Sequence, residues 1–303
     1  MKIDVIKTHL GENKISVYEI FKNHDLIKKT GIEHVYETQL SSVQLAKKAC
    51  EKIKDLNSRK IKLCIMVTQT PDDFLPANSI KLTDEINLSK NCFAFDINQG
   101  CSGFVQALCV VSKLVRFYDE ILLVTVDKYR SKLRVDDRAT NAVFSDGAAA
   151  TIISKNGSCK IVYEDHYVDG SKRSLLYQTI NKEENDGFLH MSGAELWMFT
   201  RLKVVPQICK AIEFCKMKKL NLEGIYMHQA SKTVVDGISN LLPVHTDLIF
   251  RSYNLYGNTV SSTIPFMLER YPLKFKNENS VFIIAGFGVG LTSSIIVLGK
   301  DNG

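Results

Sequence analysis

The chain has 303 residues, of which 45% are hydrophobic and 24% charged, with a net charge of +6 and a pI near 8.7. This length can bury a large core, as one domain or as two fused halves. The basic residues are scattered, which favours a solvated surface over nucleic-acid binding, although a diffuse positive field also suits an acidic carrier protein or a phosphorylated cofactor. No apolar run approaches the roughly 18 residues of a membrane span. The N-terminus lacks an apolar core of signal-peptide length, so we expect a cytoplasmic protein.

Strands and helices alternate along the chain, a pattern typical of an α/β fold with largely buried sheets. In chain order, the first half is predicted to contain strands over 62–71, 92–98, 120–128 and 147–154, with helices over 76–88 and 101–118. The second half is predicted to contain strands over 223–229, 246–254, 280–288 and 292–299, with helices over 232–242 and 259–271.

The two sets of elements match each other in order, which indicates a duplicated α/β unit. Equivalent turns, Gly100-Cys101 in one set and Gly257-Asn258 in the other, can then meet at one site. We expect an N-terminal half at 1–155, a capping and linking region at 156–219 and a C-terminal half at 220–303. The polar stretch 154–187 predicts an irregular capping insertion, and a helix over 192–217 leads into the second half.

Eight cysteines are present, and no two of them form a C-x-x-C pair. Their spacing is typical neither of a zinc site nor of a disulfide framework, so we expect no metal. Cysteines in a reducing compartment mostly behave as small buried hydrophobic residues. This interpretation suits seven of the eight, and Cys101 is the exception.

Cys101 lies between two glycines, where a predicted strand gives way to a predicted helix. A helix N-terminus carries partial positive charge and free backbone N–H groups, which should lower the thiol pKa. The glycines permit a sharp turn and let a thioester approach the backbone. Taken alone, these features leave a nucleophile and a buried structural thiol equally open.

Several motifs follow one another along the chain: DINQGCSGFVQAL, FSDGAAATII, MHQAS, YGNTVSSTIP and GFGVGLTSS. With TGIEHVY and TQTPDDFLPA they resemble the type III β-ketoacyl-acyl-carrier-protein synthases, in order and over nearly the whole chain. Cys101 precedes His228 by 127 residues, and His228 precedes Asn258 by 30. The resemblance implies a thiolase-like fold, in which duplicated βαβαβ halves build five layers in the order αβαβα.

The resemblance also implies roles for particular residues. Cys101 would be acylated, and the side chains of His228 and Asn258 would donate hydrogen bonds to a thioester carbonyl oxygen. Two such donors stabilise the enolate that forms when a malonyl thioester loses CO2. The backbone N–H groups of Cys101 and Val289 would form a second oxyanion hole, and Phe287 would pack behind the site. No cofactor would be bound permanently, because the pantetheine of coenzyme A or of an acyl-carrier protein serves as the handle.

Competing motif interpretations fail. GFGVGL imitates part of a dinucleotide fingerprint, but only 13 residues follow Gly290, too few for the rest of that motif. GCSGF lacks the spacing of a G-x-S-x-G serine elbow, so Ser102 is a poor nucleophile. Asp96, Asp127 and Asp146 lie at predicted strand ends or turns, where a structural role in caps and loops is expected.

The substrate entrance departs from the family pattern. The family usually has a Trp that stacks on adenine where this chain has Asp25, and an Arg where it has Lys29, whereas Arg138 is kept. Family asparagines that contact pantetheine are replaced by Ala194 and Ser231. Loss of the aromatic platform removes roughly 1–3 kcal/mol of stacking, if values from nucleic acids apply. The catalytic residues are therefore retained, while recognition of the acyl donor is rebuilt.

Residues implicated in partner contacts differ as well. A basic position that serves carrier docking in the family is Thr233 here, and the remaining positive charge would come from Arg201, Lys203 and Lys232. The family implies a homodimer in which Leu75 reaches from the partner to the floor of the acyl pocket. The family often has Phe there, so a smaller residue favours an acyl chain longer or bulkier than acetyl.

Three functions stay open at this point. The first is carbon–carbon bond formation on an unusual acyl donor by a specialised member, rather than by the enzyme that starts fatty-acid synthesis. The second is transfer of the acyl group from Cys101 to a hydroxyl or amine. The third is an inactive partner subunit that acts as a binding module. His228 and Asn258 together favour the first, because transfer to oxygen or nitrogen needs a base but no enolate donors.

Overall fold

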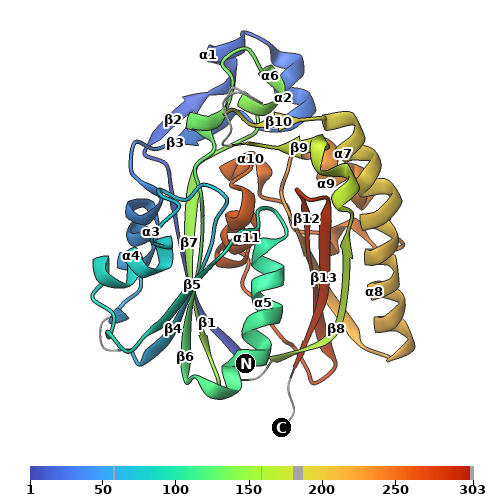
Figure 1. The fold of residues 1–303 in the computed structure, drawn as a ribbon. Helices are drawn as coiled ribbons and strands as arrows, with labels where there is room; N and C mark the ends of the chain where they lie inside the picture. Colours follow the sequence, from blue (N-terminus) through green and yellow to red (C-terminus); the bar gives the residue numbers. More distant parts are fainter. Residues whose placement is uncertain (57–58, 158, 180–186, 301–303) are drawn as a thin grey trace.

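The computed structural model describes residues 1–56, 59–157, 159–179 and 187–300. Figure 1 shows two sheets side by side, with helices between them and on both outer sides. The N-terminal elements are β1 (Lys2–Leu10), β2 (Asn13–Ser16), α1 (Val17–Phe21), α2 (His24–Thr30), β3 (His34–Glu37), α3 (Ser42–Glu51), β4 (Ile61–Val67), α4 (Asn78–Glu85), β5 (Phe93–Ile97), α5 (Gly103–Leu114), η2 (Val115–Phe117), β6 (Glu120–Asp127), η3 (Arg130–Lys132), α6 (Arg138–Asn141) and β7 (Gly147–Ser154).

The rest of the chain supplies the second sheet and its helices. Its elements are β8 (Cys159–Val168), η4 (Gly170–Leu175), β9 (Leu176–Tyr177), β10 (His190–Met191), α7 (Gly193–Phe199), η5 (Thr200–Val204), α8 (Val205–Met217), β11 (Asn221–Met227), α9 (Lys232–Ser239), η6 (Thr246–Leu248), α10 (Tyr253–Tyr256), η7 (Val260–Ser262), α11 (Thr263–Arg270), β12 (Ser280–Gly288) and β13 (Thr292–Lys300).

The two large sheets have matching strand orders. The first is β1-β7-β6-β4-β5, in which β4 runs parallel to β5 and β6, whereas β1 and β7 are antiparallel to their neighbours. The second is β8-β13-β12-β11, and these four strands have the same relative directions as β1, β7, β6 and β4 of the first sheet. This agreement explains the duplicated pattern of the sequence.

Three hydrophobic clusters fill the spaces between layers. Helices α3 and α4 cover the outer face of the first sheet, and α8 and α9 cover the outer face of the second. Helices α5 and α11 lie between the sheets, where side chains such as Leu108 and Met267 contact both. Strands buried on both faces are largely apolar, and this explains why β4, β6 and β12 could be predicted from the sequence. The predicted five-layered α/β fold is confirmed.

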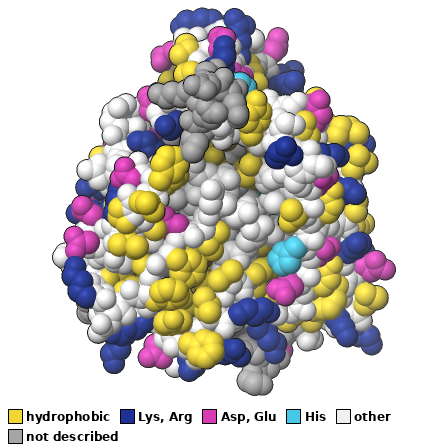
Figure 2. All heavy atoms as spheres, viewed as in Figure 1, with side chains coloured by type: hydrophobic (Ala, Val, Ile, Leu, Met, Phe, Trp, Pro, Cys, Tyr) yellow, Lys and Arg dark blue, Asp and Glu magenta, His cyan; other side chains and the backbone are white. Residues whose placement is uncertain are grey.

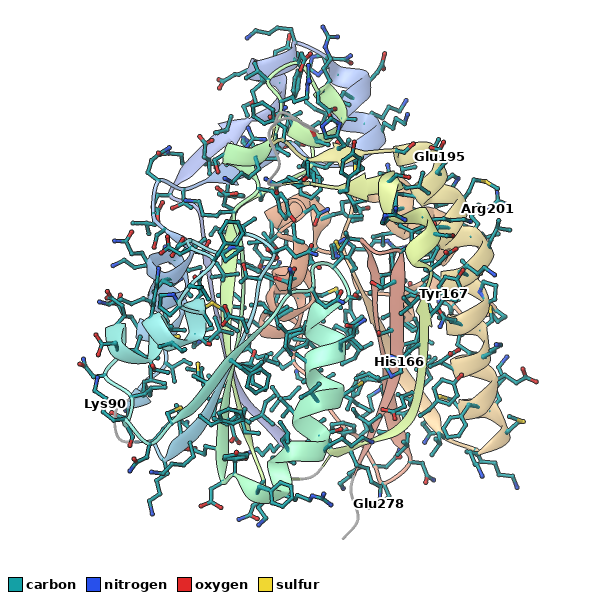
Figure 3. All side chains as sticks on the ribbon, in the orientation of Figure 1. Lys90, His166, Tyr167, Glu195, Arg201 and Glu278 are labelled. Atoms are coloured by element: carbon teal, nitrogen blue, oxygen red, sulfur yellow. The ribbon has the colours of Figure 1, made fainter. Side chains whose placement is uncertain are left out.

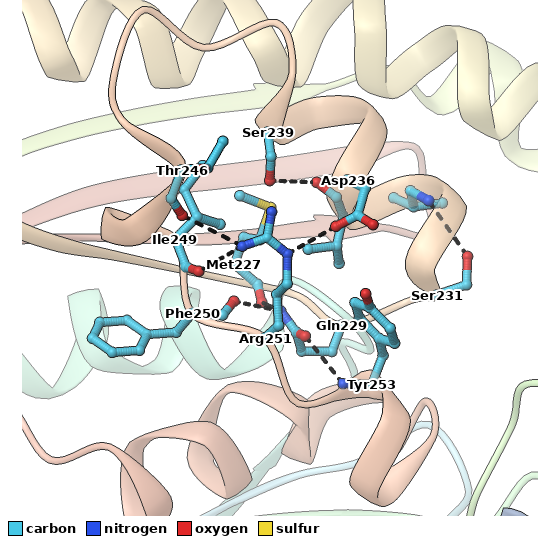
Figure 4. Close-up of polar contacts among 12 residues, drawn as sticks. Met227, Gln229, Ser231, Asp236, Ser239, Thr246, Ile249, Phe250, Arg251 and Tyr253 are labelled. Carbon is cyan, nitrogen blue, oxygen red and sulfur yellow. Dashed lines mark hydrogen bonds and ion pairs between the residues drawn. The ribbon is translucent and has the colours of Figure 1, made fainter. Parts of the chain in front are cut away.

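The strand predicted over 246–254 is wrong. This segment contains the short helix η6, and its only pairing is an isolated bridge between Ile225 and Ile249. Figure 4 shows the cause: side chains bind the backbone groups that a ladder would use. Arg251 Nη1 donates to the carbonyl of Ile249 at 2.9 Å, and Gln229 Oε1 accepts from the two N–H groups that follow Arg251, at 2.8 and 3.2 Å.

The irregular insertion predicted over 154–187 is wrong across Cys159–Val168. These residues form β8, which pairs antiparallel with β13 and completes the second sheet. Strand β8 has no residue but Cys159 fully buried, and polar residues such as Lys160, Glu164 and His166 are exposed along it, so it lacks the apolar run of a strand buried on both faces. Residues 180–186 lie outside the described part of the chain. The division of the chain into units at 155 and 220 stays a prediction.

The parallel strands position the site. Strands β4, β5, β6, β11 and β12 end toward the same side of the molecule, beneath α1, α2 and the β9–β10 hairpin (Figure 1). Carboxyl ends of parallel strands are the usual place for ligand sites in α/β folds. Among the described residues, no helix is long and apolar enough to cross a membrane.

Candidate active site

A cavity of about 670 Å³ opens at these strand ends, and Cys101 lies in its wall. The wall draws on the loops that follow β4, β5 and β6 and on the turn between β12 and β13. Wall residues that closely follow these strands are Gln69, Asn98, Cys101, Tyr129 and Val289, and Val260 of η7 joins them in the wall. Further out, the cavity is lined by apolar side chains that include Phe144, Leu176 and Leu189.

Cys101 is held in a turn between β5 and α5, and its side chain is 7% exposed. Strand β12 approaches the thiol closely at Gly288. A Cβ atom on Gly288 would lie 3.0 Å from Cys101 Sγ and 2.8 Å from its Cβ, inside normal contact distance. Only glycine permits this approach.

Two backbone N–H groups point toward the sulfur of Cys101. They belong to Cys101 itself and to Val289, and both act to lower the pKa of the thiol. They are the two donors that the sequence assigned to an oxyanion hole. Their role toward the oxygen of an acyl group bound to Cys101 stays a prediction.

The expectation that the pKa of Cys101 falls is wrong for the unliganded protein. Burial raises the pKa of the Cys101 thiol to about 12, and the nearby carboxylate of Asp127 adds to the rise. The helix effect is weak because α5 begins at Gly103, two residues further on, whereas the thiolate would have to lose its solvent entirely. Cys101 therefore carries its proton at neutral pH.

His228 directly follows β11 and is 2% exposed. Its Nδ1 lies 2.8 Å from the hydroxyl of Thr263, and its ring meets Phe287 edge-on at 5.6 Å between centroids. Burial lowers the pKa of His228 to about 3. The imidazole is therefore neutral at physiological pH, and one of its nitrogens carries a proton while the other does not.

The contacts of Thr263 bear on which nitrogen carries that proton. The Thr263 hydroxyl is also 3.1 Å from the carbonyl oxygen of Val260, but that oxygen already accepts the backbone N–H of Thr263. A carbonyl oxygen can accept two hydrogen bonds, so the single proton of the Thr263 hydroxyl can go either to Val260 or to Nδ1 of His228. Donation to Nδ1 leaves the imidazole proton on Nε2, which has no partner among the described residues, and a donor role of His228 toward a ligand requires this tautomer.

Asn258 is buried in the turn before η7. Its Oδ1 accepts from the backbone N–H of Val260 at 2.9 Å, and its own N–H donates to the carbonyl of Val143 at 2.7 Å. Its Nδ2 has no acceptor in the described part of the chain. Val260 adopts φ +53°, a conformation that costs a β-branched residue about 1–3 kcal/mol and is typical of functional sites.

Shared neighbours connect these three residues. Cys101 and Val260 line the same cavity, and the backbone of Asn258 bridges to Phe144 in its wall. Cys101 also belongs to one hydrophobic cluster with Phe287, which contacts His228. The convergence of the three side chains on one substrate atom stays a prediction.

The predicted pantetheine contacts lie outside this cavity wall. Lys29, Arg138 and Ala194 are exposed, and Ser231 caps α9 by accepting from the backbone N–H of Val234. The carbonyl of Lys29 accepts a hydrogen bond from Thr233, which fastens α2 to α9. Asp25 is exposed in the first turn of α2. Their roles in substrate binding stay predictions.

The three cations predicted for carrier docking are exposed. Arg201 and Lys203 come from η5 and Lys232 from the start of α9. Arg201 lies 6.0 Å from the ring of Trp197, and Lys203 lies 5.2 Å from the ring of Tyr167. Figure 3 shows Arg201 on the outer side of the helical layer, away from α5.

The three aspartates predicted as structural are confirmed in that role. Asp96 accepts from the first two N–H groups of α4, at 2.7 and 2.8 Å. Asp127 accepts from the N–H groups of Gln69 and Ser261, at 2.8 and 3.2 Å. Asp146 accepts from two loop N–H groups at 2.9 and 3.0 Å. These carboxylates fix the loops that surround Cys101.

Sequence reasoning missed Gln69 and Tyr129 as site residues. Each closely follows a buried parallel strand, β4 and β6 respectively, and both line the cavity with Cys101. Their position two residues beyond the strand ends was the available signal. Neither residue type stands out without the packing.

The remaining seven cysteines were predicted to be small buried hydrophobic residues, and this is wrong for Cys92, Cys109 and Cys209, which are only partly buried. No disulfide joins any two of the eight, all of which are described. Cys109 does lie with Glu164 and His166 on the surface, with donor atoms within 4.8 Å of one another. Figure 3 places His166 on β8, and the three residues are not part of the wall around Cys101. The expected absence of a metal stays a prediction.

Comparisons with known proteins agree with this fold. Residues 95–170 match the family model of 3-oxoacyl-[acyl-carrier-protein] synthase III, and residues 212–299 match the model of its C-terminal part. The β-ketoacyl-[acyl-carrier-protein] synthase III of Clostridium perfringens is 30% identical over 285 residues, which cover 87% of this chain and 86% of that protein. The protein of the same name from Streptococcus agalactiae is 29% identical over a match that covers 92% of this chain and 95% of that protein.

Solved structures show the same architecture. The 3-oxoacyl-[acyl-carrier-protein] synthase III of Aquifex aeolicus has a TM-score of 0.86 at 22% identity and covers 98% of this chain and 99% of that one. A priming β-ketosynthase of the R1128 polyketide pathway has a TM-score of 0.83 at 20% identity, covering 98% and 95%. The fold and the buried cysteine thus define an acyltransferase of the thiolase-fold class. The chain belongs to the 3-oxoacyl-[acyl-carrier-protein] synthase III family.

Proposed function

We propose that this protein loads an acyl group onto Cys101 from coenzyme A or an acyl-carrier protein and then condenses it with a malonyl thioester. The observation that carries the proposal is the buried Cys101 thiol in the wall of a cavity of about 670 Å³, with Gly288 of β12 packed against its sulfur. A cavity of this size beside a thiol has room for a substrate.

The first half-reaction is transthioesterification. The sulfur of Cys101 attacks the carbonyl carbon of the incoming thioester, and the N–H groups of Cys101 and Val289 stabilise the oxyanion that forms. The C–S bond to the carrier then breaks. The proton of Cys101 ends on the departing pantetheine thiol, so charge and atoms balance.

The second half-reaction is decarboxylative condensation. The malonyl thioester loses CO2, and its two bonding electrons pass into an enolate. The enolate carbon attacks the acyl carbonyl on Cys101, a carbon–carbon bond forms, and the Cys101 thiolate leaves and takes up one proton. His228 Nε2 and Asn258 Nδ2, which lack other partners, would donate to the enolate oxygen.

The neutral state of His228 favours this reaction over acyl transfer to a hydroxyl or amine. Such transfer needs a general base with a pKa near the working pH. Burial lowers the pKa of His228 to about 3, which makes it a poor base but leaves it able to donate. Ester or amide formation therefore ranks second. An inactive binding module ranks third, because Cys101, His228 and Asn258 are all present.

The acyl donor is proposed to be carrier-bound, with pantetheine as the handle. Asp25 offers no aromatic surface for an adenine ring, whereas Arg201, Lys203 and Lys232 are exposed for an acidic carrier. A family member that has Asp25 in place of the usual Trp at the substrate entrance is better suited to a specialised condensation than to the first step of fatty-acid synthesis.

A homodimer is also proposed. Strand β5 is the edge of the first sheet, and Phe93 on it is 55% exposed, while Leu75 in the loop between β4 and α4 is 86% exposed. Figure 2 shows hydrophobic side chains gathered on the face formed by α5 and β5. A second copy that covers this edge would bury these residues and could bring Leu75 to the partner's cavity.

Intact-protein mass spectrometry tests the proposed chemistry. Wild type and Cys101→Ala are incubated with acyl-coenzyme A and with acyl-carrier protein, and only wild type should gain the acyl mass. Malonyl-carrier protein should then clear the adduct with release of CO2. An adduct that resists malonyl but is cleared by an amine or alcohol would support the second function, and no adduct from either donor would support the third.

A further inference from the structure

The cavity wall beside Cys101 is polar where an acyl chain would begin. Gln69 and Tyr129 both line the cavity that contains the thiol. The side chain of Gln69 lies against Gly100, the residue before Cys101, so closely that a Cβ atom on Gly100 would collide with Gln69 Oε1. The glycine at this turn therefore makes room for the amide of Gln69.

The hydrogen bonds of this polar pair are incomplete. The Tyr129 hydroxyl donates to Gln69 Oε1 at 3.4 Å, longer than the usual hydrogen bond to oxygen. Gln69 Nε2 donates to no group among the described residues. Tyr129 is almost fully buried and packs against Phe144. The amide donor of Gln69 and the weakly hydrogen-bonded hydroxyl of Tyr129 therefore face the space beside Cys101.

Such an arrangement disfavours a plain alkyl chain. An alkyl group placed there would displace water from the amide of Gln69 and supply no hydrogen bond in return, and an unpaired buried polar group is costly. Beyond the pair, Phe144, Leu176 and Leu189 offer an apolar wall for the rest of a short chain.

We infer that the acyl group loaded onto Cys101 carries a hydroxyl within its first few carbons, which binds between Gln69 and Tyr129. This inference rests on the proposed acylation of Cys101. A hydroxyl can accept from Gln69 Nε2 and exchange a hydrogen bond with the Tyr129 hydroxyl at the same time.

A carboxylate fits this position less well than a hydroxyl. The neutral pair provides no charge to balance it, and the buried carboxylate of Asp127 lies close to Cys101. The cations of the cavity, Lys132 and Arg173, are exposed to solvent. A charged acyl group would therefore lose more solvation than the site returns.

The experiment compares initial rates of Cys101 acylation by 3-hydroxybutyryl, butyryl and succinyl groups, each on coenzyme A and on an acyl-carrier protein, by intact-protein mass. We expect 3-hydroxybutyryl to load about tenfold or more faster than butyryl. Gln69→Leu and Tyr129→Phe should each lower the ratio of the 3-hydroxybutyryl rate to the butyryl rate, and thermal melting checks that each variant is folded. Tyr118→Phe, which lies outside the cavity wall, should keep the wild-type ratio.

The outcomes separate this inference from the proposed function. If no acyl group appears on Cys101 from any donor, the proposed function fails and the inference fails with it. If butyryl loads as fast as 3-hydroxybutyryl, or if Gln69→Leu leaves their ratio unchanged, the function stands and the hydroxyl subsite is overturned. Fastest loading of succinyl would replace the hydroxyl by a carboxylate.

Discussion

Cys101 combines a buried neutral thiol with two converging backbone donors. Because burial raises the pKa of the Cys101 thiol to about 12, little thiolate is present at neutral pH. This arrangement would limit oxidation of the nucleophile, since oxidation acts on the thiolate.

Alkylation of Cys101 by iodoacetamide should therefore rise steeply with pH. Because burial raises the pKa of Cys101 to about 12, the thiolate fraction should grow about tenfold per pH unit between pH 7 and 9, without a plateau. Peptide mapping by mass spectrometry measures the rate at Cys101, and the partly exposed Cys209 provides an internal comparison. A plateau below pH 8 would contradict a strongly raised pKa.

Thr263 is expected to act as a positioning residue for His228. Thr263→Val removes the hydroxyl that lies 2.8 Å from Nδ1, and the proposed donor role of Nε2 requires that this hydroxyl donates to Nδ1. Release of CO2 from a malonyl thioester should fall about tenfold or more, while acylation of Cys101 stays near wild type. Thr263→Ser should restore decarboxylation. Equal loss of both half-reactions would indicate a structural defect instead.

The last residue of β12, Gly288, lies against Cys101, so a side chain added at Gly288 should slow acylation of the thiol. Gly288→Ala places a Cβ 3.0 Å from Cys101 Sγ, and acylation should slow by about tenfold or more because either the thiol or the turn bearing Val289 must shift. Gly299→Ala in β13 is the matched control, since its Cβ would meet only side-chain methyl groups, the nearest at 3.2 Å. The measurement is the rate of adduct formation by intact mass, with thermal melting to check the fold.

Strand β5 carries the proposed dimer edge. Phe93→Asp places a charge on this half-exposed edge position and should shift the protein to a monomer, because burying an unpaired carboxylate in an apolar interface is costly. Light scattering coupled to size-exclusion chromatography measures the mass. Glu278→Asp, on the surface near the C-terminus, is the control, because it leaves the net charge unchanged. A wild-type monomer at micromolar concentration would refute the proposed dimer.

The pH dependence of the whole molecule's stability should depend on His228. Its folded-state pKa of about 3 lies below the unfolded value of 6.5, so between these values the unfolded chain binds a proton that the folded chain excludes. The native state should lose stability as pH falls from 6.5 toward 3. Relative to pH 7, His228→Gln should spare about 2–3 kcal/mol of this loss at pH 4.5, measured by urea unfolding. Parallel pH profiles would contradict the lowered pKa.

Much of the architecture was predictable because it is encoded locally. Strands β4, β6, β7, β12 and β13 are continuous apolar runs, and such runs indicate strands buried on both faces. Strand β8 was not predicted because one of its faces is exposed to solvent. The segment 246–254 looked like a strand from its composition, but Gln229 and Arg251 bind the backbone groups it would need. Such contacts cannot be read from neighbours in the chain.

The sequence by itself determined the α/β alternation and the duplication, because residue type and spacing carry that information, and its resemblance to a known family made Cys101, His228 and Asn258 candidates. Only the tertiary structure decided that the Cys101 thiol and the His228 imidazole are neutral at physiological pH and that Gln69 and Tyr129 line the same cavity as Cys101. The physical reason is that burial and hydrogen bonding depend on segments far apart in the chain, and these set protonation and the shape of a binding site.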